Sequence, residues 1–137
     1  MKKLVFELEI YTYQIDFVGH VSNIVYIQWM EIGRTKLLEY IGLPITSISE
    51  SGIVPILIHT SIKYKKALYL HDKVKIEIWI SELTNLTAVI KFNFYNSKGE
   101  LAAFSEQTGL MINKKNLKPH RLTIEERTAF EKILIKE

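Results

Sequence analysis

The chain has 137 residues, of which 47% are hydrophobic and 24% charged, and this balance excludes a chain that is mainly disordered. A net charge of +3 permits an anionic ligand but is too small to indicate nucleic-acid binding. The absence of cysteine excludes disulfides, thiolate metal sites and cysteine nucleophiles, and no apolar run reaches the ~20 residues that a membrane span needs. We therefore expect one domain over residues 1–137 and a cytoplasmic location.

Apolar and polar side chains alternate over residues 3–13, and this period of two predicts a strand. The polar segment that follows contains Gly19 and has no clear period, so we expect a loop. From about Asn23 apolar residues recur at three- to four-residue spacing, which predicts an amphipathic helix of roughly 18 residues. Gly42 and Pro44 indicate where this helix ends. Its apolar positions are Ile27, Met30, Leu37 and Ile41.

Four further strands are predicted after Gly52, where the period of two returns and persists. Turn-forming segments near 83–87 and at 96–99 suit hairpins, so we expect these strands to follow one another as an antiparallel meander. The predicted sheet has one strongly apolar face, and the long helix is available to cover it. The pattern therefore predicts an α+β fold, a five-stranded antiparallel sheet wrapped around one long central helix.

The last periodic segment, 123–134, predicts a short C-terminal helix. Thr123 and Glu126 have the spacing of a capping box, which marks the start of a helix. Phe130 and Ile133 of this helix could pack on the sheet or face a partner.

Asp16 is the leading candidate for a reactive group. It stands about six residues before the predicted helix, which is too far for an ordinary N-cap, and Ser22 or Asn23 is better placed for that role. The first N–H groups of the helix, near Asn23, lack intrahelical acceptors and favour negative charge. They could stabilise the oxyanion of a substrate carbonyl while Asp16 attacks it or activates water. A purely structural Asp16 remains the alternative.

Two histidines are weighed beside Asp16. His20 could hold a water molecule or orient Asp16, or it could pack as a structural residue beside the loop. His59 lies on a predicted strand, on the face opposite the apolar one, where a subunit contact is possible. The four histidines show no metal-ligand spacing and the chain lacks thiols, so we expect no metal site.

A positive patch is expected at the end of the second predicted strand. It consists of Lys63, Lys65 and Lys66, interleaved with Tyr64. One interpretation is a solvated sheet edge that lysine protects against aggregation. The other is a contact with the phosphates of a nucleotide-bearing ligand.

The segment "IDFVGHVSNIVYIQWMEIGRTKLLEYIGL" resembles the signature of hotdog-fold thioesterases of the 4-hydroxybenzoyl-CoA thioesterase type. The segment "SIKYKKALYLHDKVKIE" is similar to a further strand-and-turn pattern of that family. The likeness spans about residues 3–122. The positions that match the signature are Asp16, Gly19, Asn23, Tyr26, Trp29, Glu31 and Arg34.

The resemblance implies that Asp16 is the catalytic carboxylate and that a backbone N–H near Asn23 polarises the thioester carbonyl. It also implies a homodimer or homotetramer with each site at a subunit interface, where His20 could assist. No cofactor is expected, since CoA or phosphopantetheine enters as part of the substrate. We expect substrate contacts from Gly19, Tyr26, His59, Lys63, Lys65 and Lys66.

Departures from the pattern leave the carrier open between acyl-CoA and acyl-ACP. "HVSNIVYIQW" is similar to acyl-ACP thioesterases, but Val18 occupies the position of their functional asparagine. Gln14 replaces an acid that many bacterial members carry, and Lys66 replaces the usual proline. Because one fold hosts many activities, a non-catalytic hotdog module that binds acyl-CoA or acyl carrier protein is the alternative function.

Overall fold

The computed structural model describes residues 3–137. Its elements in chain order are β1 (Leu4–Glu9), η1 (Thr12–Gln14), α1 (Asn23–Tyr40), α2 (Ile45–Glu50), β2 (Ile53–Tyr64), β3 (Lys73–Leu83), β4 (Thr87–Tyr95), β5 (Leu101–Asn113) and α3 (Ile124–Glu131). The long helix begins at the predicted residue and has the predicted 18 residues.

Two short elements were not predicted from the sequence. The first strand ends at Glu9 rather than near residue 13, because the chain turns into η1, where Gln14 Oε1 accepts a hydrogen bond from Tyr11 N at 2.8 Å. The helix α2 begins directly after Pro44. Pro44 therefore both stops α1 and precedes a new helix, since its fixed φ suits the residue before a helical turn.

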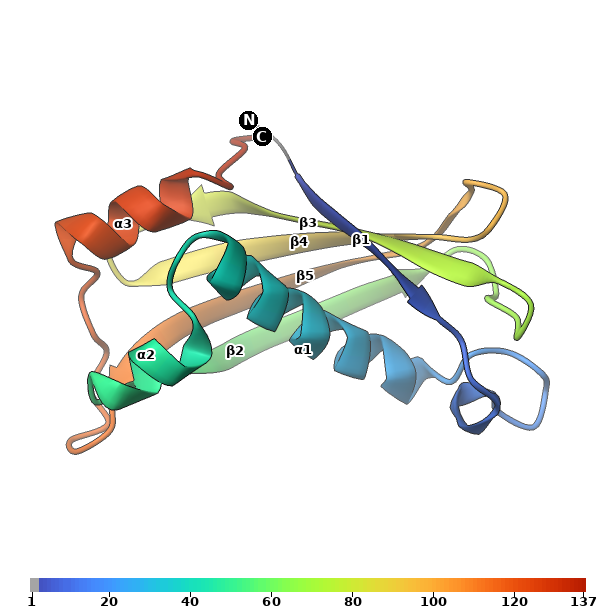
Figure 1. Ribbon diagram of the computed structural model, residues 1–137, viewed down its shortest axis with the longest axis horizontal. Helices are drawn as coiled ribbons and strands as arrows, with labels where there is room; N and C mark the ends of the chain where they lie inside the picture. The colour runs from blue at the N-terminus through green and yellow to red at the C-terminus, as the bar shows by residue number, and fades with distance from the viewer. Residues whose placement is uncertain (1–2) are drawn as a thin grey trace.

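The five strands form one antiparallel sheet in the order β1-β3-β4-β5-β2, which confirms the predicted sheet (Figure 1). The predicted four-strand meander is wrong at β2. Only β3, β4 and β5 are joined by hairpins, whereas β2 pairs with β5 and residues 65–72 carry the chain across to β3. The alternation of side chains identifies a strand but not its neighbour, so the pattern did not reveal the crossover.

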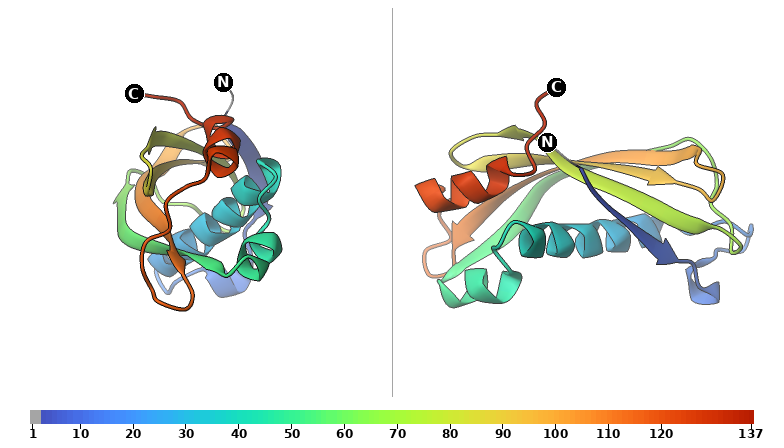
Figure 2. Two further views of the ribbon diagram at one scale, coloured as in Figure 1. Left: turned by 90° about the vertical axis from the view of Figure 1, so that its left-hand side faces the viewer. Right: turned by 45° about the horizontal axis from the view of Figure 1, so that its top comes forward.

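The sheet curves around α1, which lies on its concave side (Figure 2). Met30 and Leu37 are buried as predicted, but Ile27 is 44% exposed and belongs to the outer side of the helix. Gly33 allows the closest approach, since a Cβ there would lie 3.1 Å from the Phe92 ring. The helix is thus held on the sheet along its length, with the loop of Asp16 at one end (Figure 1).

The C-terminal helix α3 packs on the sheet, which confirms one of the two predicted alternatives. Phe130 and Ile133 are buried, and Ile80 N donates to Ile133 O at 3.0 Å. The capping box is confirmed, since Glu126 N donates to Thr123 Oγ1 at 3.1 Å and Thr123 N to Glu126 Oε1 at 2.8 Å. Chain segments far apart in sequence therefore meet near the C-terminal half of α1.

Candidate active site

The loop before α1 is closed by its own backbone. Ile15 and Val21 form an antiparallel bridge, and Asp16 N donates to His20 O at 2.8 Å. Gly19 N donates back to Asp16 O at 3.0 Å, and Gly19 has a φ of +87°, a conformation that side chains disfavour. The segment is therefore a compact, ordered turn that presents Asp16 at the surface.

The Asp16 carboxylate supports this loop with one of its oxygens. Oδ1 accepts hydrogen bonds from the backbone N–H groups of Val18 and His20, each at 3.1 Å. Asp16 thus does not cap α1; it holds its own turn, as aspartate often does in turns. Its second oxygen makes no hydrogen bond to residues 3–137, and the side chain is exposed. One carboxylate oxygen is structural and the other remains available to a ligand.

The start of α1 offers free donors beside this loop. Ser22 is the N-cap residue, but its side chain makes no capping hydrogen bond. Ser22 N donates to Gln14 O at 2.9 Å and Val25 N to Ser22 O at 3.0 Å, while Asn23 N and Ile24 N find no acceptor in the described chain. These two N–H groups, with the positive end of the helix dipole, suit an oxyanion.

His20 and the loop are docked on the crossover segment 65–72. Val21 N donates to Leu68 O at 2.9 Å, and the His20 ring packs edge-on against Tyr69 with ring centroids 5.3 Å apart. Tyr69 is in turn fixed by Asp72, whose Oδ2 accepts from Tyr69 N at 3.0 Å. The His20 ring is therefore packed against an aromatic neighbour, while the His20 backbone is held by Asp16.

Asp72 itself is a buried carboxylate with its hydrogen bonds satisfied. Oδ1 accepts from Ser97 N at 3.1 Å, so Asp72 ties the crossover to the hairpin between β4 and β5. Burial alone would raise the pKa of Asp72, but hydrogen bonds from Tyr69 and Ser97 outweigh it and hold the pKa below its usual value. This residue was not singled out from the sequence.

Tyr26 lies beneath the surface in the single chain. It is 2% exposed and packs among Trp29, Tyr64 and Phe94, with ring centroids 5.1 to 5.2 Å away. Burial raises the pKa of Tyr26, so the phenol stays neutral. The aromatic cluster anchors the first half of α1 to the sheet, and a substrate contact of Tyr26 stays a prediction.

The three lysines at the end of β2 differ in their surroundings. Lys66 Nζ lies 2.6 Å from Glu100 Oε2, and Lys65 Nζ lies 5.7 Å from the centroid of the Phe104 ring. Lys63 and His59 are exposed on β2. Both interpretations of the patch therefore stand, and Lys63 is the one of the three lysines with neither an ion pair nor an aromatic-ring contact among residues 3–137.

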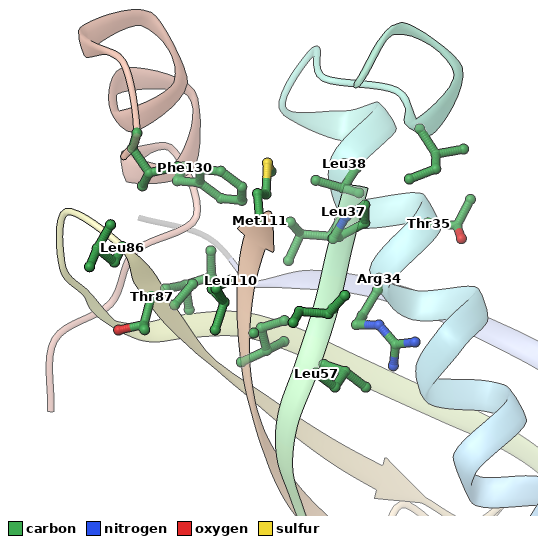
Figure 3. Close-up of a pocket in the computed structure, with 18 of the residues that line it drawn as sticks. Arg34, Thr35, Leu37, Leu38, Leu57, Leu86, Thr87, Leu110, Met111 and Phe130 are labelled. Carbon is green, nitrogen blue, oxygen red and sulfur yellow. The ribbon is translucent and has the colours of Figure 1, made fainter. Parts of the chain in front are cut away.

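An apolar cavity of about 470 Å³ lies toward the other end of α1, lined by that helix, α2, β2, β3, β4, β5 and α3 (Figure 3). The sequence reasoning missed it. Its polar side is Arg34, whose Nη1 donates to Gln107 Oε1 at 2.7 Å, while Gln107 Nε2 donates to Thr60 Oγ1 at 3.2 Å. Gln107 is fully buried, and a polar residue at an inward position of a strand was the one available signal.

Asp16 and the cavity are separated within one chain. Arg34 lies about three turns beyond the start of α1, and at ~1.5 Å of rise per residue this is roughly 17 Å. One chain therefore does not bring the candidate acid onto the cavity that could hold an apolar group.

Neither a membrane span nor a metal site stands out among residues 3–137. None of the described helices is long and apolar enough to cross a membrane. The described residues also contain no group of three or more histidine, aspartate or glutamate side chains arranged to hold a metal ion.

Several named proteins are similar to this chain in sequence or in fold. Over 113 residues the chain is 27% identical to the Bacillus subtilis protein named "Putative acyl-CoA thioesterase YneP", with 82% of each chain covered. The structure matches a DHNA-CoA thioesterase from Staphylococcus aureus with a TM-score of 0.90 and 26% identity, covering 97% of this chain and 91% of that one. A 1,4-dihydroxy-2-naphthoyl-CoA thioesterase from Synechocystis has the same fold, with a TM-score of 0.85 at 18% identity and coverages of 93% and 95%.

These matches confirm the expected hotdog fold, and the names of the relatives bear out the expected enzyme class, a thioester hydrolase. A family model described as the thioesterase-like superfamily matches residues 10–129, which is most of the chain. The protein therefore belongs to the thioesterase-like superfamily.

Proposed function

We propose that the protein hydrolyses an acyl-CoA thioester at Asp16. The observation that carries this proposal is the arrangement at the start of α1, where Asp16 keeps one carboxylate oxygen available and Asn23 N and Ile24 N have no acceptor in the described chain. A carboxylate next to unpaired N–H donors has the two components that acyl transfer to water requires. An acyl-ACP is the alternative carrier.

In this reaction Asp16 acts as base or as nucleophile. As base it takes a proton from water, whose oxygen adds to the thioester carbonyl; as nucleophile its own oxygen adds and water then cleaves the acyl-enzyme anhydride. In both routes the N–H groups near Asn23 stabilise the carbonyl oxyanion, the C–S bond breaks, and the thiolate sulfur takes up a proton. His20 would hold the water or orient the loop.

The separation of Asp16 from the cavity favours a site shared between two copies. The strand β2 is an unpaired edge, and Ile56, Leu57 and Ile58 are exposed along it. Two β2 edges related by a two-fold axis pair antiparallel, which also reverses α1 in the second copy. The Asp16 loop of one copy would then lie toward the cavity end of the other.

The remaining expectations fit this homodimer. Lys63, Lys65 and Lys66 would meet the phosphates of the nucleotide at the mouth of the site, with His59 close to the subunit contact. Gly19 and Tyr26 would support the substrate from the loop and from the first turn of α1. A homotetramer and a cytoplasmic location stay predictions of the sequence.

The substitution Asp16→Asn tests the proposal cleanly. An asparagine amide oxygen can still accept the hydrogen bonds from Val18 N and His20 N, so the loop should keep its shape while the charge is lost. We expect kcat/KM on a panel of acyl-CoAs to fall about 10²- to 10⁴-fold at an unchanged melting temperature. Equal hydrolysis by the variant and the parent protein would show that Asp16 is not the reagent.

A further inference from the structure

Arg34 is held in one orientation inside the cavity. Its Nη1 donates to Gln107 Oε1 at 2.7 Å, and Gln107 is anchored in turn by its hydrogen bond to Thr60 Oγ1 at 3.2 Å. Because Gln107 is fully buried and both ends of its amide are engaged, it cannot turn away. The guanidinium is thus a fixed donor with further N–H groups for a second acceptor.

The charge of Arg34 is not neutralised by contact with an acid. None of the ion pairs among residues 3–137 involves Arg34. Burial lowers the pKa of Arg34 and the nearby Glu31 acts in the opposite direction, but a guanidinium stays protonated in either case. Glu31 also lines the cavity, one turn earlier on α1, and it is exposed. A partly buried cation without an acid in contact favours an anionic occupant.

The rest of the cavity is mostly apolar. Most side chains around Arg34 are aliphatic or aromatic, and they come from α1 itself and from six further elements, α2, β2, β3, β4, β5 and α3 (Figure 3). They include Leu37, Leu38, Leu57, Ile90, Met111 and Phe130. A volume of about 470 Å³ suits an acyl group rather than a whole CoA molecule. The occupant must therefore be apolar over most of its length and carry its charge at one place.

We infer that the cavity takes an ω-carboxyacyl group, the half-thioester of a dicarboxylic acid, and that Arg34 binds its distal carboxylate. The inference rests on the proposed thioester hydrolysis. Apolar walls contact the methylene chain, while the guanidinium forms charge-assisted hydrogen bonds with the carboxylate. Gln107 is then a positioning residue, because it orients Arg34 without touching the substrate.

Binding of two CoA thioethers tests this inference without any turnover. S-(5-carboxypentyl)-CoA and S-hexyl-CoA differ only at the far end of the chain, and neither can be hydrolysed. By isothermal titration calorimetry we expect S-(5-carboxypentyl)-CoA to bind at least about tenfold more tightly than S-hexyl-CoA, which is the range of a charged hydrogen bond. Arg34→Met should remove this preference, and Arg34→Lys should keep part of it.

Two matched variants control for charge. Glu31→Gln removes a negative charge from the same cavity, so the preference for the carboxylate should stay or grow. Lys36→Met removes a cation from the same helix outside the cavity, where Lys36 Nζ lies 5.4 Å from the centroid of the Phe6 ring, and should leave the preference unchanged. A loss of preference in Lys36→Met equal to that in Arg34→Met would assign the effect to overall charge and overturn the inference.

Other outcomes are equally decisive. Equal binding of the two thioethers, tighter binding of S-hexyl-CoA, or no binding of either would overturn the inference, as would a preference that survives Arg34→Met. In that last case, a group other than Arg34 would bind the carboxylate. Hydrolysis of adipoyl-CoA against hexanoyl-CoA is measured separately. If neither is hydrolysed, the proposed function fails while the thioether result still decides the role of Arg34.

Discussion

The two ends of α1 are built in opposite ways. At the first end, a short loop is held by backbone hydrogen bonds and by one carboxylate, and Phe17 and Val18 beside Asp16 stand exposed. At the second end, apolar side chains from seven elements line a cavity, and Arg34 is held there by its buried partner Gln107. The first end has the groups proposed for chemistry, and the second has the apolar cavity, whose one lining carboxylate is Glu31. The groups proposed for chemistry and for selectivity therefore lie apart in one chain.

The largest expected effect tests whether the two ends cooperate between copies. Asp16→Asn removes the reagent, and Ala88→Phe places a ring in the cavity, so each variant alone should be nearly inactive toward longer acyl groups. If the site combines Asp16 of one copy with the cavity of the other, a 1:1 mixture that exchanges subunits regains about a quarter of the parent activity, because half of the dimers contain one intact site. Relative to Asp16→Asn, this is a gain of about 25-fold or more.

Two controls make this experiment interpretable. The mixture is denatured and refolded together so that subunits exchange, and size-exclusion chromatography confirms the dimer. Ala88→Ser changes the same position without filling the cavity and should remain active. Activity that stays at the level of the separate variants would indicate that Asp16 and the cavity serve the site from a single chain.

The same comparison explains what the sequence could and could not predict. The loop end depends on residues close in the chain, so Asp16, Gly19 and the helix start at Asn23 were all found from spacing and from the family signature. The cavity end depends on side chains that only the fold brings together. Arg34 was noticed as a signature position, but its contact with Gln107, 73 residues away, was not.

The position of β2 in the sheet was not predicted, for a related reason. Alternation fixes which side of a strand is buried, and it predicted the five strands correctly, but it is silent on strand order. The order decides that β2 is an edge beside β5, and hence which face could meet a second copy. Asp72 was likewise not singled out from the sequence, because its buried hydrogen bonds to Tyr69 and Ser97 arise only after the crossover and a hairpin meet.

A second prediction concerns the polar support of the loop end. Asp72→Ala leaves two backbone N–H groups without an acceptor, and we expect the free energy of unfolding to fall by about 2 kcal/mol. The same truncation at a surface acid such as Glu50, which is exposed, should have little effect. Urea unfolding at pH 7 measures both. A loss below about 0.5 kcal/mol for Asp72→Ala would mean that the crossover does not depend on this carboxylate.

The pKa of Asp72 gives this prediction a pH signature. The pKa of Asp72 in the folded protein lies below the usual value near 3.8. The charged carboxylate therefore stabilises the fold fully at pH values above the usual pKa. The contribution is lost as the pH falls through the lower, folded-state pKa. We therefore expect the difference in unfolding free energy between the parent protein and Asp72→Asn to shrink between about pH 5 and pH 2. A difference that is constant with pH would contradict this assignment.

The smallest expected effect is at Gly19, where a substitution would change only the strain of the backbone. Gly19 has a φ of +87°, and a Cβ added there would meet no atom within 4 Å, so Gly19→Ala would strain the backbone without a steric clash. We expect a loss of about 1 kcal/mol in unfolding free energy, and Gly19→Asn should lose less because asparagine tolerates positive φ better. Since Asp16 Oδ1 is held by the N–H groups on either side of Gly19, kcat/KM should fall with stability in the same order. If alanine and asparagine are tolerated equally in both measurements, the turn at Gly19 does not hold the Asp16 carboxylate in place.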